Sequence, residues 1–158
     1  MKDHQNIFKG INYTLAIDHA AACYYKLALL VARSGSGKTN LLKKICGQMQ
    51  IPLINLGISL SQKLLPLTSR ERKLKTCEII SEIIDAQDAP RLAIDNTEII
   101  FDPSLMLNPL GLLQSLSRTR LLIWSWNGEL EDGHVTYAYP GHPECRLIPT
   151  SEITLITL

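Results

Sequence analysis

The chain has 158 residues, a formal net charge of +1 at pH 7 and an aromatic content of only 6%. This length allows a buried core, and we expect a single domain. The near-zero charge excludes nucleic-acid binding through overall charge and leaves only a local basic patch for it. Many aliphatic and few aromatic residues favour an α/β fold over an all-β sandwich.

The N-terminal residues 1–6 are polar and no long apolar segment follows them. The sequence therefore predicts neither a signal peptide nor a membrane span. The four cysteines form no CxxC pair; they are Cys23, Cys46, Cys77 and Cys145. We expect reduced core thiols of a cytoplasmic protein, and neither a disulfide framework nor a zinc site.

Residues 11–25 predict a helix that packs ahead of the first strand. Its apolar positions are Ile11, Leu15, Ala16, Ala20, Ala21 and Cys23. Tyr24 and Tyr25 end the helix. One of them could stack on an adenine, and packing in the core or at a hinge is the alternative.

A glycine-rich turn between a strand and a helix is the most specific feature of the sequence. The apolar run 27–31 predicts a buried parallel strand, and apolar residues recur at helical spacing from Leu41 to Met49. Between them lies Ala32-Arg33-Ser34-Gly35-Ser36-Gly37-Lys38-Thr39, which predicts a phosphate-binding loop (P-loop) that opens on Ala instead of Gly. Glycines let successive backbone N–H groups converge on phosphate oxygens at the N-terminus of a helix.

We therefore expect ATP and Mg²⁺ at this loop. Lys38 would reach the β- and γ-phosphates, and the Thr39 hydroxyl would ligate Mg²⁺. The predicted nucleotide-contacting residues are Arg33, Ser34, Gly35, Ser36, Gly37, Lys38, Thr39 and Asn40. The alternative is a surface turn that matches the motif by chance.

Residues 51–57 predict a second strand, and 58–65 predict a short helix or turn. Thr68-Ser69-Arg70-Glu71 has the form of a capping box and begins a long helix. The buried stripe of this helix would be Leu74, Cys77, Ile80, Ile83 and Ile84. A basic cluster near its start could contact nucleic acid or a neighbouring subunit, or form a solvated face; it comprises Arg70, Arg72, Lys73 and Lys75.

A third predicted strand, 91–95, ends in an acidic residue. In P-loop ATPases such an acid, here Asp95, holds Mg²⁺ on the phosphates; the alternative is an ordinary acid at a strand end. Asn96 stands where many such ATPases have the glutamate that polarises the attacking water. The nearest carboxylate is Glu98, which could be the catalytic base or a helix-start acid favoured by the helix dipole.

Asn108 and Pro109 begin a further helix, and Arg118-Thr119-Arg120 closes it. The fourth strand, 121–126, ends on Asn127. This residue could hold the lytic water or sense the γ-phosphate, with Ser125 behind it; an ordinary Asn-Gly turn is the alternative.

Together these elements predict a three-layer α/β P-loop NTPase of the additional-strand branch, which has RecA-like and AAA-like members. We expect a parallel core sheet in which the fourth strand separates the acid strand from the loop strand. We assign residues 1–25 to an N-terminal helix, 26–127 to the core and 128–158 to a C-terminal strand or hairpin extension, with no helical lid domain. In this extension, 134–139 follows too short a loop to be a parallel strand, and 153–158 could add a strand or bind a partner.

Short segments spread over nearly the whole chain carry a resemblance to a known family; they are 25–27, 34–39, 54–56, 64–65, 92–98, 116–118, 126–128, 137–138 and 142–144. The Trp126-Asn127-Gly128 and His142-Pro143-Glu144 segments are the more particular ones. These segments resemble the BrxF family, small P-loop proteins encoded in type-three BREX bacteriophage-defence systems. The resemblance implies a cytoplasmic ATPase acting beside other BREX proteins, including a large ATPase, a DNA methyltransferase and a phosphatase-like protein. It also implies a role in blocking phage DNA replication while host DNA is methylated.

Three functions remain open. The first is an ATPase subunit of a defence complex that works as a homo-oligomer, because no arginine is obviously placed on its own γ-phosphate; DNA could be bound directly or through partners. The second is a small-molecule kinase, although residues 127–146 offer only Arg146 for an arginine-rich lid. The third is a nucleotide-gated scaffold with little hydrolysis, which Asn96 supports.

For the first function we favour Arg118 as the catalytic arginine from a neighbouring subunit. It occupies a rigid corner between a helix and a strand, and it matches the resembled family. The alternatives are Arg70, Arg72 and Arg120.

Overall fold

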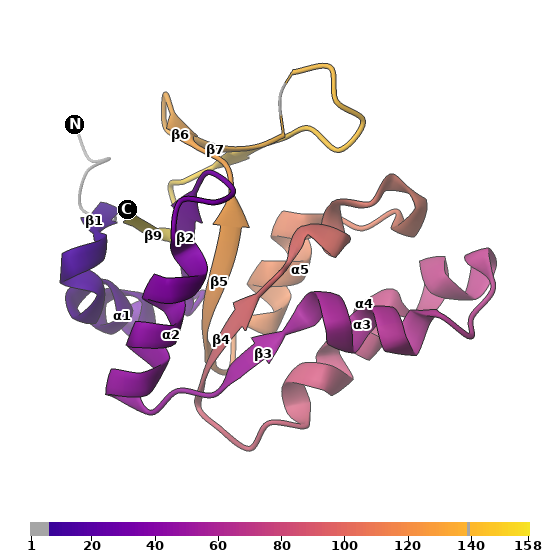
Figure 1. The fold of residues 1–158 in the computed structure, drawn as a ribbon, viewed down its shortest axis with the longest axis horizontal. Helices are drawn as coiled ribbons and strands as arrows, with labels where there is room; N and C mark the ends of the chain where they lie inside the picture. The colour runs from indigo at the N-terminus through magenta and orange to yellow at the C-terminus, as the bar shows by residue number, and fades with distance from the viewer. Residues whose placement is uncertain (1–6, 139) are drawn as a thin grey trace.

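The protein is a three-layer α/β structure built on one parallel sheet (Figure 1), and the computed structural model describes residues 7–138 and 140–158. The strands of this sheet, in chain order, are β1 (Ile7–Lys9), β2 (Leu27–Ala32), β3 (Leu53–Asn55), β4 (Arg91–Asp95), β5 (Leu121–Asn127) and β9 (Thr154–Thr157). They lie in the order β1-β9-β2-β5-β4-β3, and every neighbouring pair is parallel.

Helices cover both faces of the sheet. The α-helices are α1 (Tyr13–Ala22), α2 (Lys38–Met49), α3 (Leu56–Leu64), α4 (Ser69–Asp85) and α5 (Pro109–Leu116); the 3₁₀ helices are η1 (Gly10–Asn12), η2 (Glu98–Phe101) and η3 (Pro103–Leu105). Figure 1 shows α1 and α2 on one side of the sheet and α3, α4 and α5 on the other. Leu27, Leu29 and Val31 of β2 join the core on the α3–α5 side, whereas Ala28 and Leu30 join the core under α1 and α2. Because both faces are buried, this strand is a continuous apolar run.

The predicted strand order is confirmed, since β5 lies between β2 and β4. The register pairs Ala32 with Asn127, and Asn55 with Asp95. The last residues of these strands therefore meet along one edge, which we call the carboxyl edge. The opposite edge, where β2 and β5 begin, is the amino edge.

Capping chemistry sets several helix boundaries. At the start of α4, the Thr68 hydroxyl accepts a hydrogen bond from the Glu71 backbone N–H, and the Glu71 carboxylate accepts one from the Thr68 N–H at 2.8 Å. The predicted capping box is thus confirmed. Asn108 caps α5, with Pro109 as the first helical residue, as predicted. The predicted second strand is too long, because Asn55 caps α3 by accepting from the Ile58 N–H at 3.1 Å.

The helix predicted over residues 11–25 is present but shorter, and the segment 1–25 that was assigned to it also contains a strand. Residues 7–9 form β1, the helix itself is Tyr13–Ala22, and residues 1–6 lie outside the described part of the chain. Ile11 and Leu15, expected on the buried face, are 88% and 60% exposed, while Ile17 is buried. The buried face consists of residues 16, 17 and 20, which are neighbours on one side of a helix.

The buried stripe of α4 is shifted from the predicted one. Leu74 is 73% exposed and Cys77 is also exposed, whereas Thr76 is fully buried beside Ile80. The Thr76 hydroxyl donates to the Arg72 carbonyl oxygen at 2.5 Å, which satisfies its polar group inside the helix. The hydrophobic pattern of the sequence did not predict that a threonine would be buried here.

The four cysteines are free thiols, and none of them is fully buried, although Cys46 packs against the core. Cys77 is exposed, and Cys23, Cys46 and Cys145 are half-buried. Burial raises the pKa of the Cys46 thiol, and the negative charge of Asp95 adds to the shift.

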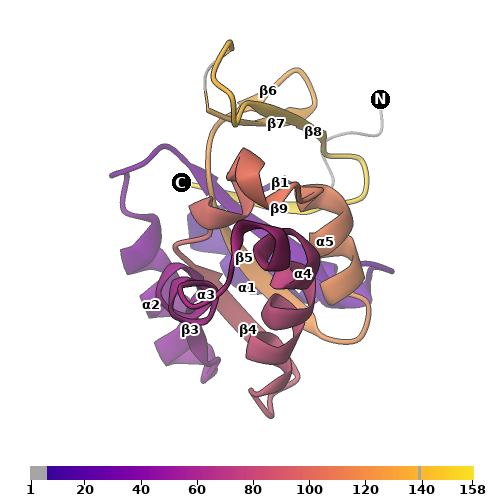
Figure 2. The ribbon, with the colours of Figure 1, turned by 90° about the vertical axis from the view of Figure 1, so that its right-hand side faces the viewer.

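Beyond β5 the chain forms a second, antiparallel sheet of β6 (Leu130–Glu131), β7 (His134–Tyr137) and β8 (Arg146–Pro149). Figures 1 and 2 show this sheet beyond the end of the main sheet. Trp126 donates its indole N–H to the Thr136 carbonyl oxygen at 2.8 Å, and Phe101 stacks on Tyr137 with ring centroids 3.6 Å apart. An added Cβ at Gly128 would lie 1.7 Å from the same carbonyl oxygen, so only glycine permits this close approach.

The chain then returns to the main sheet. β9 pairs in parallel with both β1 and β2, so the predicted extra strand near residues 153–158 is confirmed. Part of the C-terminal extension, β9, therefore belongs to the core sheet. The described residues after β5, 128–138 and 140–158, form strands and contain no helix.

Candidate functional site

The glycine-rich turn, residues 33–37, connects β2 to α2 at the carboxyl edge. Gly35 and Gly37 have φ values of 76° and 100°, in the left-handed region that side chains disfavour. A Cβ added at either position would meet nothing within 4 Å. The turn thus requires these glycines for its backbone shape and not for lack of space.

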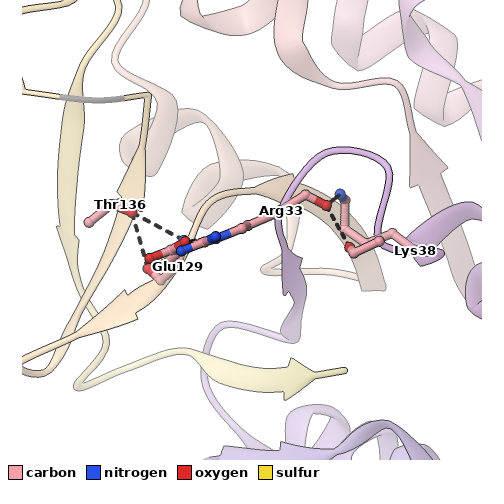
Figure 3. Close-up of polar contacts among 5 residues, drawn as sticks. Arg33, Lys38, Glu129 and Thr136 are labelled. Carbon is pink, nitrogen blue, oxygen red and sulfur yellow. Dashed lines mark hydrogen bonds and ion pairs between the residues drawn. The ribbon is translucent and has the colours of Figure 1, made fainter.

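Lys38 is the first residue of α2 and bends back over this turn (Figure 3). Its ammonium donates to the Arg33 carbonyl oxygen at 2.9 Å, and the residue is only 7% exposed. Burial lowers the pKa of Lys38, while the nearby carboxylates of Glu98 and Asp95 oppose the shift. A buried cation is therefore held at the mouth of the turn, where a phosphate anion would stabilise its charge.

Asp95 ends β4 and is 6% exposed. The Thr39 hydroxyl donates to its Oδ2 at 2.8 Å, and the Ser125 hydroxyl donates to its Oδ1 at 2.7 Å. Thr97 fixes this arrangement from behind by donating to the Ser125 carbonyl oxygen at 2.6 Å. Ser125 was predicted near the site, whereas Thr97 was given no role, because its contact with Ser125 joins two separate segments of the chain.

Glu98 and Asn127 meet above Asp95. Asn127 is the last residue of β5, Glu98 is the first residue of η2, and the Asn127 amide donates to a Glu98 carboxylate oxygen. Glu98 thus starts a short helix and also faces the site, so its two predicted roles do not exclude each other. Asn127 is more than a turn residue, since it holds this carboxylate.

These side chains surround one cavity of about 250 Å³, which we call the polar cavity. Its lining residues are Ser34, Gly35, Gly37, Lys38, Thr39, Asn40, Asp95, Asn96, Glu98 and Asn127. One ammonium faces two carboxylates, with hydroxyl and amide groups between them. Such a set can bind an anion through Lys38 and a hard cation through Thr39 and Asp95.

Three predicted site residues lie outside the polar cavity. The Arg33 side chain extends away from it and forms an ion pair with Glu129, which contacts Thr136 of the second sheet (Figure 3). The Ser36 hydroxyl donates to the Arg33 carbonyl oxygen at 2.5 Å. Arg118 lies at the amino edge, and β5, with 7 residues, spans about 20 Å between the two edges. Its guanidinium therefore does not reach the cavity of its own chain.

A second pocket, of about 770 Å³, adjoins the polar cavity; we call it the acidic pocket. It lies between the glycine-rich turn and the second sheet, and its lining residues are Arg33, Ser34, Asn127, Gly128, Glu129, Glu131, Thr136, Tyr137, Ala138, Pro140, His142, Glu144, Cys145 and Leu147. Burial raises the pKa of Tyr137 to about 12, with smaller contributions from Glu144 and Glu98. The sequence does not predict this pocket, because its residues come from three separate segments with no common motif.

The basic cluster of α4 divides into two kinds of residue. Arg72 donates to the carbonyl oxygens of Leu64 and Leu67 at 2.9 and 3.1 Å, so it caps the end of α3. Lys73 and Lys75 are exposed, as is Arg70. Arg72 is therefore a structural residue, whereas the other three form a solvated face.

Comparisons with protein-family models, with curated proteins and with solved structures find no match for the chain. In the described part of the chain, no helix is both long enough and apolar enough to cross a membrane. Nor do residues 7–138 and 140–158 contain a group of three or more His, Cys, Asp and Glu side chains that could hold a metal ion by themselves.

Proposed function

We propose that the chain is a P-loop NTPase of the additional-strand branch, with RecA-like and AAA-like members, that binds ATP with Mg²⁺ in the polar cavity. One observation carries the proposal: the Thr39 hydroxyl bonds to Asp95 at 2.8 Å, beside the buried ammonium of Lys38. In P-loop proteins a hydroxyl and a strand-end acid hold the metal, and the lysine contacts the terminal phosphates.

The residues present fit both ligands. Mg²⁺ is usually bound by one or two protein groups together with substrate phosphates, and Thr39 and Asp95 supply such a pair. The Lys38 ammonium donates a hydrogen bond to a backbone carbonyl oxygen. A phosphate oxygen carries negative charge and is therefore a stronger acceptor for an ammonium than a carbonyl oxygen is. When bound, Mg²⁺ would neutralise charge on the β- and γ-phosphates.

For hydrolysis we propose Glu98 as the general base. The Asn127 amide holds its carboxylate at the rim of the polar cavity, on the same side as Asp95. A carboxylate fixed in this way could accept a proton from the attacking water. Asn127 would then be a positioning residue for the base.

Charge that develops on the γ-phosphate needs a further cation, and we propose that a neighbouring chain supplies it. Of the four arginines considered, Arg72 caps α3, and Arg120 donates to the Ile84 and Gln87 carbonyl oxygens at 3.0 and 3.1 Å. Arg118 is exposed and forms no ion pair with any of the described residues. Arg70 is also exposed and forms no ion pair among the described residues. We favour Arg118 because it occupies the corner between α5 and β5 and matches the resembled family.

The biological setting that we propose rests on the resemblance to the BrxF family alone. It is an ATPase subunit of a BREX bacteriophage-defence complex, in contact with the other proteins of that system and, directly or through them, with DNA. A second candidate function is a nucleotide-gated scaffold that binds ATP and hydrolyses it very slowly. Asn96 supports it, because this residue stands next to Asp95 where many such ATPases have the catalytic glutamate.

Phosphate release, measured first with the protein alone and then with DNA or partner proteins, separates these functions. An ATPase releases phosphate in at least one condition, and a scaffold binds ATP without release in any of them. A small-molecule kinase would instead show ATP consumption without phosphate release when its acceptor is present. No ATP binding under any condition would contradict the proposal as a whole.

A further inference from the structure

The acidic pocket beyond the carboxyl edge and a group of cations at the amino edge are complementary in charge and in apolar character. We propose that the acidic pocket of one chain receives the amino-edge corner of a second copy, so that copies associate head to tail. Association by itself is independent of nucleotide chemistry; its consequence for hydrolysis rests on the function proposed above.

The acidic pocket is suited to a cation on an apolar body. Glu131 is exposed and Glu144 half-buried, and neither forms an ion pair among the described residues, whereas Glu129 is already paired with Arg33. Apolar surface comes from Leu147, which is 66% exposed. Carboxylates beside apolar surface bind guanidinium and ammonium groups together with the methylene chains that carry them.

The amino edge presents such a group, which we call the basic corner: Tyr24, Lys26 and Arg118. The Arg118 guanidinium lies 5.7 Å from the centre of the Tyr24 ring, and the Lys26 ammonium donates to the Arg118 carbonyl oxygen at 3.2 Å. Tyr24 is 69% exposed. A tyrosine and an arginine are thus held together on the surface beside a lysine, and tyrosine and arginine are among the residue types that contribute most to many protein interfaces.

The two surfaces cannot meet within one chain. Lys26 directly precedes β2 and Arg33 directly follows it, so the six residues of that strand separate corner and pocket by about 20 Å. A contact between two different surfaces of identical chains is heterologous and produces a ring or a filament. The acidic pocket also shares Ser34 and Asn127 with the polar cavity. Docking would therefore bring Arg118 of one copy beside the phosphate site of the next.

Reciprocal charge reversal tests this contact directly. One variant carries Glu131→Lys with Glu144→Lys, and the other carries Lys26→Glu with Arg118→Glu. Association is measured by sedimentation velocity across a concentration series, with ATP and Mg²⁺. Each variant alone places like charges in the contact and should associate at least about tenfold more weakly than wild type. An equimolar mixture has opposite charges in both of its contacts and should regain association.

Lys73→Glu with Lys75→Glu makes the same change of charge on the exposed face of α4 and should leave association unchanged. Circular dichroism checks the fold of every variant, and Glu131→Gln with Glu144→Gln gives a milder form of the pocket variant. Three results would overturn the proposal: a monomeric wild type at all concentrations, a reversal variant that associates like wild type, or a mixture that stays apart. Binding of a single-stranded oligonucleotide at the basic corner of a monomeric wild type would assign that surface to nucleic acid instead.

The docking proposal and the proposed ATP-binding function can be tested independently of each other. The pocket variant leaves Lys38, Thr39 and Asp95 intact, so it should bind ATP within about twofold of wild type even if association is lost. Loss of association with intact ATP affinity supports both proposals. Intact association in a chain that binds no ATP supports docking alone.

Discussion

Charged side chains are buried at the carboxyl edge of the main sheet and exposed at its amino edge. At the carboxyl edge, Lys38 and Asp95 are 7% and 6% exposed, and each is held by hydrogen bonds from or to neighbouring elements. At the amino edge, Arg118 is exposed beside an exposed Tyr24. Burying a charge costs free energy unless it is paired, whereas an exposed one costs little. The carboxyl edge is thus built in advance for a charged ligand, and the amino edge is free to meet another molecule.

This difference gives the two edges different roles in our account. Substitutions at the carboxyl edge should change nucleotide binding or the chemical step within a single chain. Substitutions at the amino edge should change turnover only through a second chain.

The largest effect is expected from Arg118→Ala, which should lower ATP turnover by ~10³- to 10⁵-fold, the usual contribution of an arginine supplied by a neighbour. ATP affinity should not change, because the residue lies at the far edge from its own polar cavity. Phosphate release and calorimetry measure the two quantities, and Arg70→Ala, on the solvated face of α4, is the matched control.

Mixing separates a neighbour's arginine from a structural one. Arg118→Ala combined with Lys38→Ala should recover part of the activity that each lacks, and wild-type activity per subunit should rise with protein concentration. Constant activity per subunit across a wide dilution series, in a protein shown to be monomeric, would rule out the division of roles.

Glu98→Gln should reduce turnover by about 10²- to 10⁴-fold, the range for loss of a general base. The amide keeps the size of the side chain and can still meet Asn127, so ATP affinity should be retained. Single-turnover phosphate release measures the chemical step. Hydrolysis at the wild-type rate would show that the base lies elsewhere or comes from a partner.

Asp95→Ala should weaken ATP binding by about 10- to 100-fold in the presence of Mg²⁺ and much less in its absence. The substitution removes the carboxylate to which Thr39 and Ser125 donate, so a loss of stability is also expected. Asp95→Asn, which keeps the shape, should reproduce the metal dependence with less loss of stability. Equal losses with and without Mg²⁺ would contradict the metal role.

The smallest effect at neutral pH is expected from Tyr137→Phe, which tests how the second sheet is attached. Folded Tyr137 keeps its proton up to a pKa of about 12, whereas the unfolded chain releases it near pH 10. The free energy of unfolding should therefore fall as pH rises from about 10 to about 12, by up to about 2 to 3 kcal/mol. In the phenylalanine variant this part of the fall should be missing from urea unfolding curves. Identical alkaline profiles would show that the ring is not buried against Phe101.

Much of the sheet could be predicted from the sequence because its strands are buried on both faces and end in polar residues. The apolar runs before Ala32 and Asn127 predicted the strands. Their order and shared edge, and the meeting of Lys38, Asp95 and Glu98, were inferred from the arrangement of motifs that is typical of the additional-strand branch of P-loop NTPases. The capping residues Thr68 and Asn108 likewise predicted two helix starts. These features depend on short stretches of chain, where local chemistry decides the structure.

The rest depended on contacts between distant segments. Gly128 is needed only because the Thr136 carbonyl approaches it, and Thr97 matters only because it meets Ser125 across two strands. The pairing of β1 with β9 joins the two ends of the described chain, which no periodicity within either segment indicates. The acidic pocket was missed for the same reason.

Calorimetric titration of ATP with Mg²⁺ into dilute wild type, Lys38→Ala and Lys26→Ala tests the central claim most directly, since it compares one lysine at each edge. Our account predicts that Lys38→Ala weakens binding by at least about 10- to 100-fold, the cost of losing a charged hydrogen bond. Lys26→Ala should bind within about twofold of wild type, and both variants should keep the wild-type circular dichroism spectrum. Equal ATP affinity in wild type and Lys38→Ala would contradict the assignment of the polar cavity as the nucleotide site.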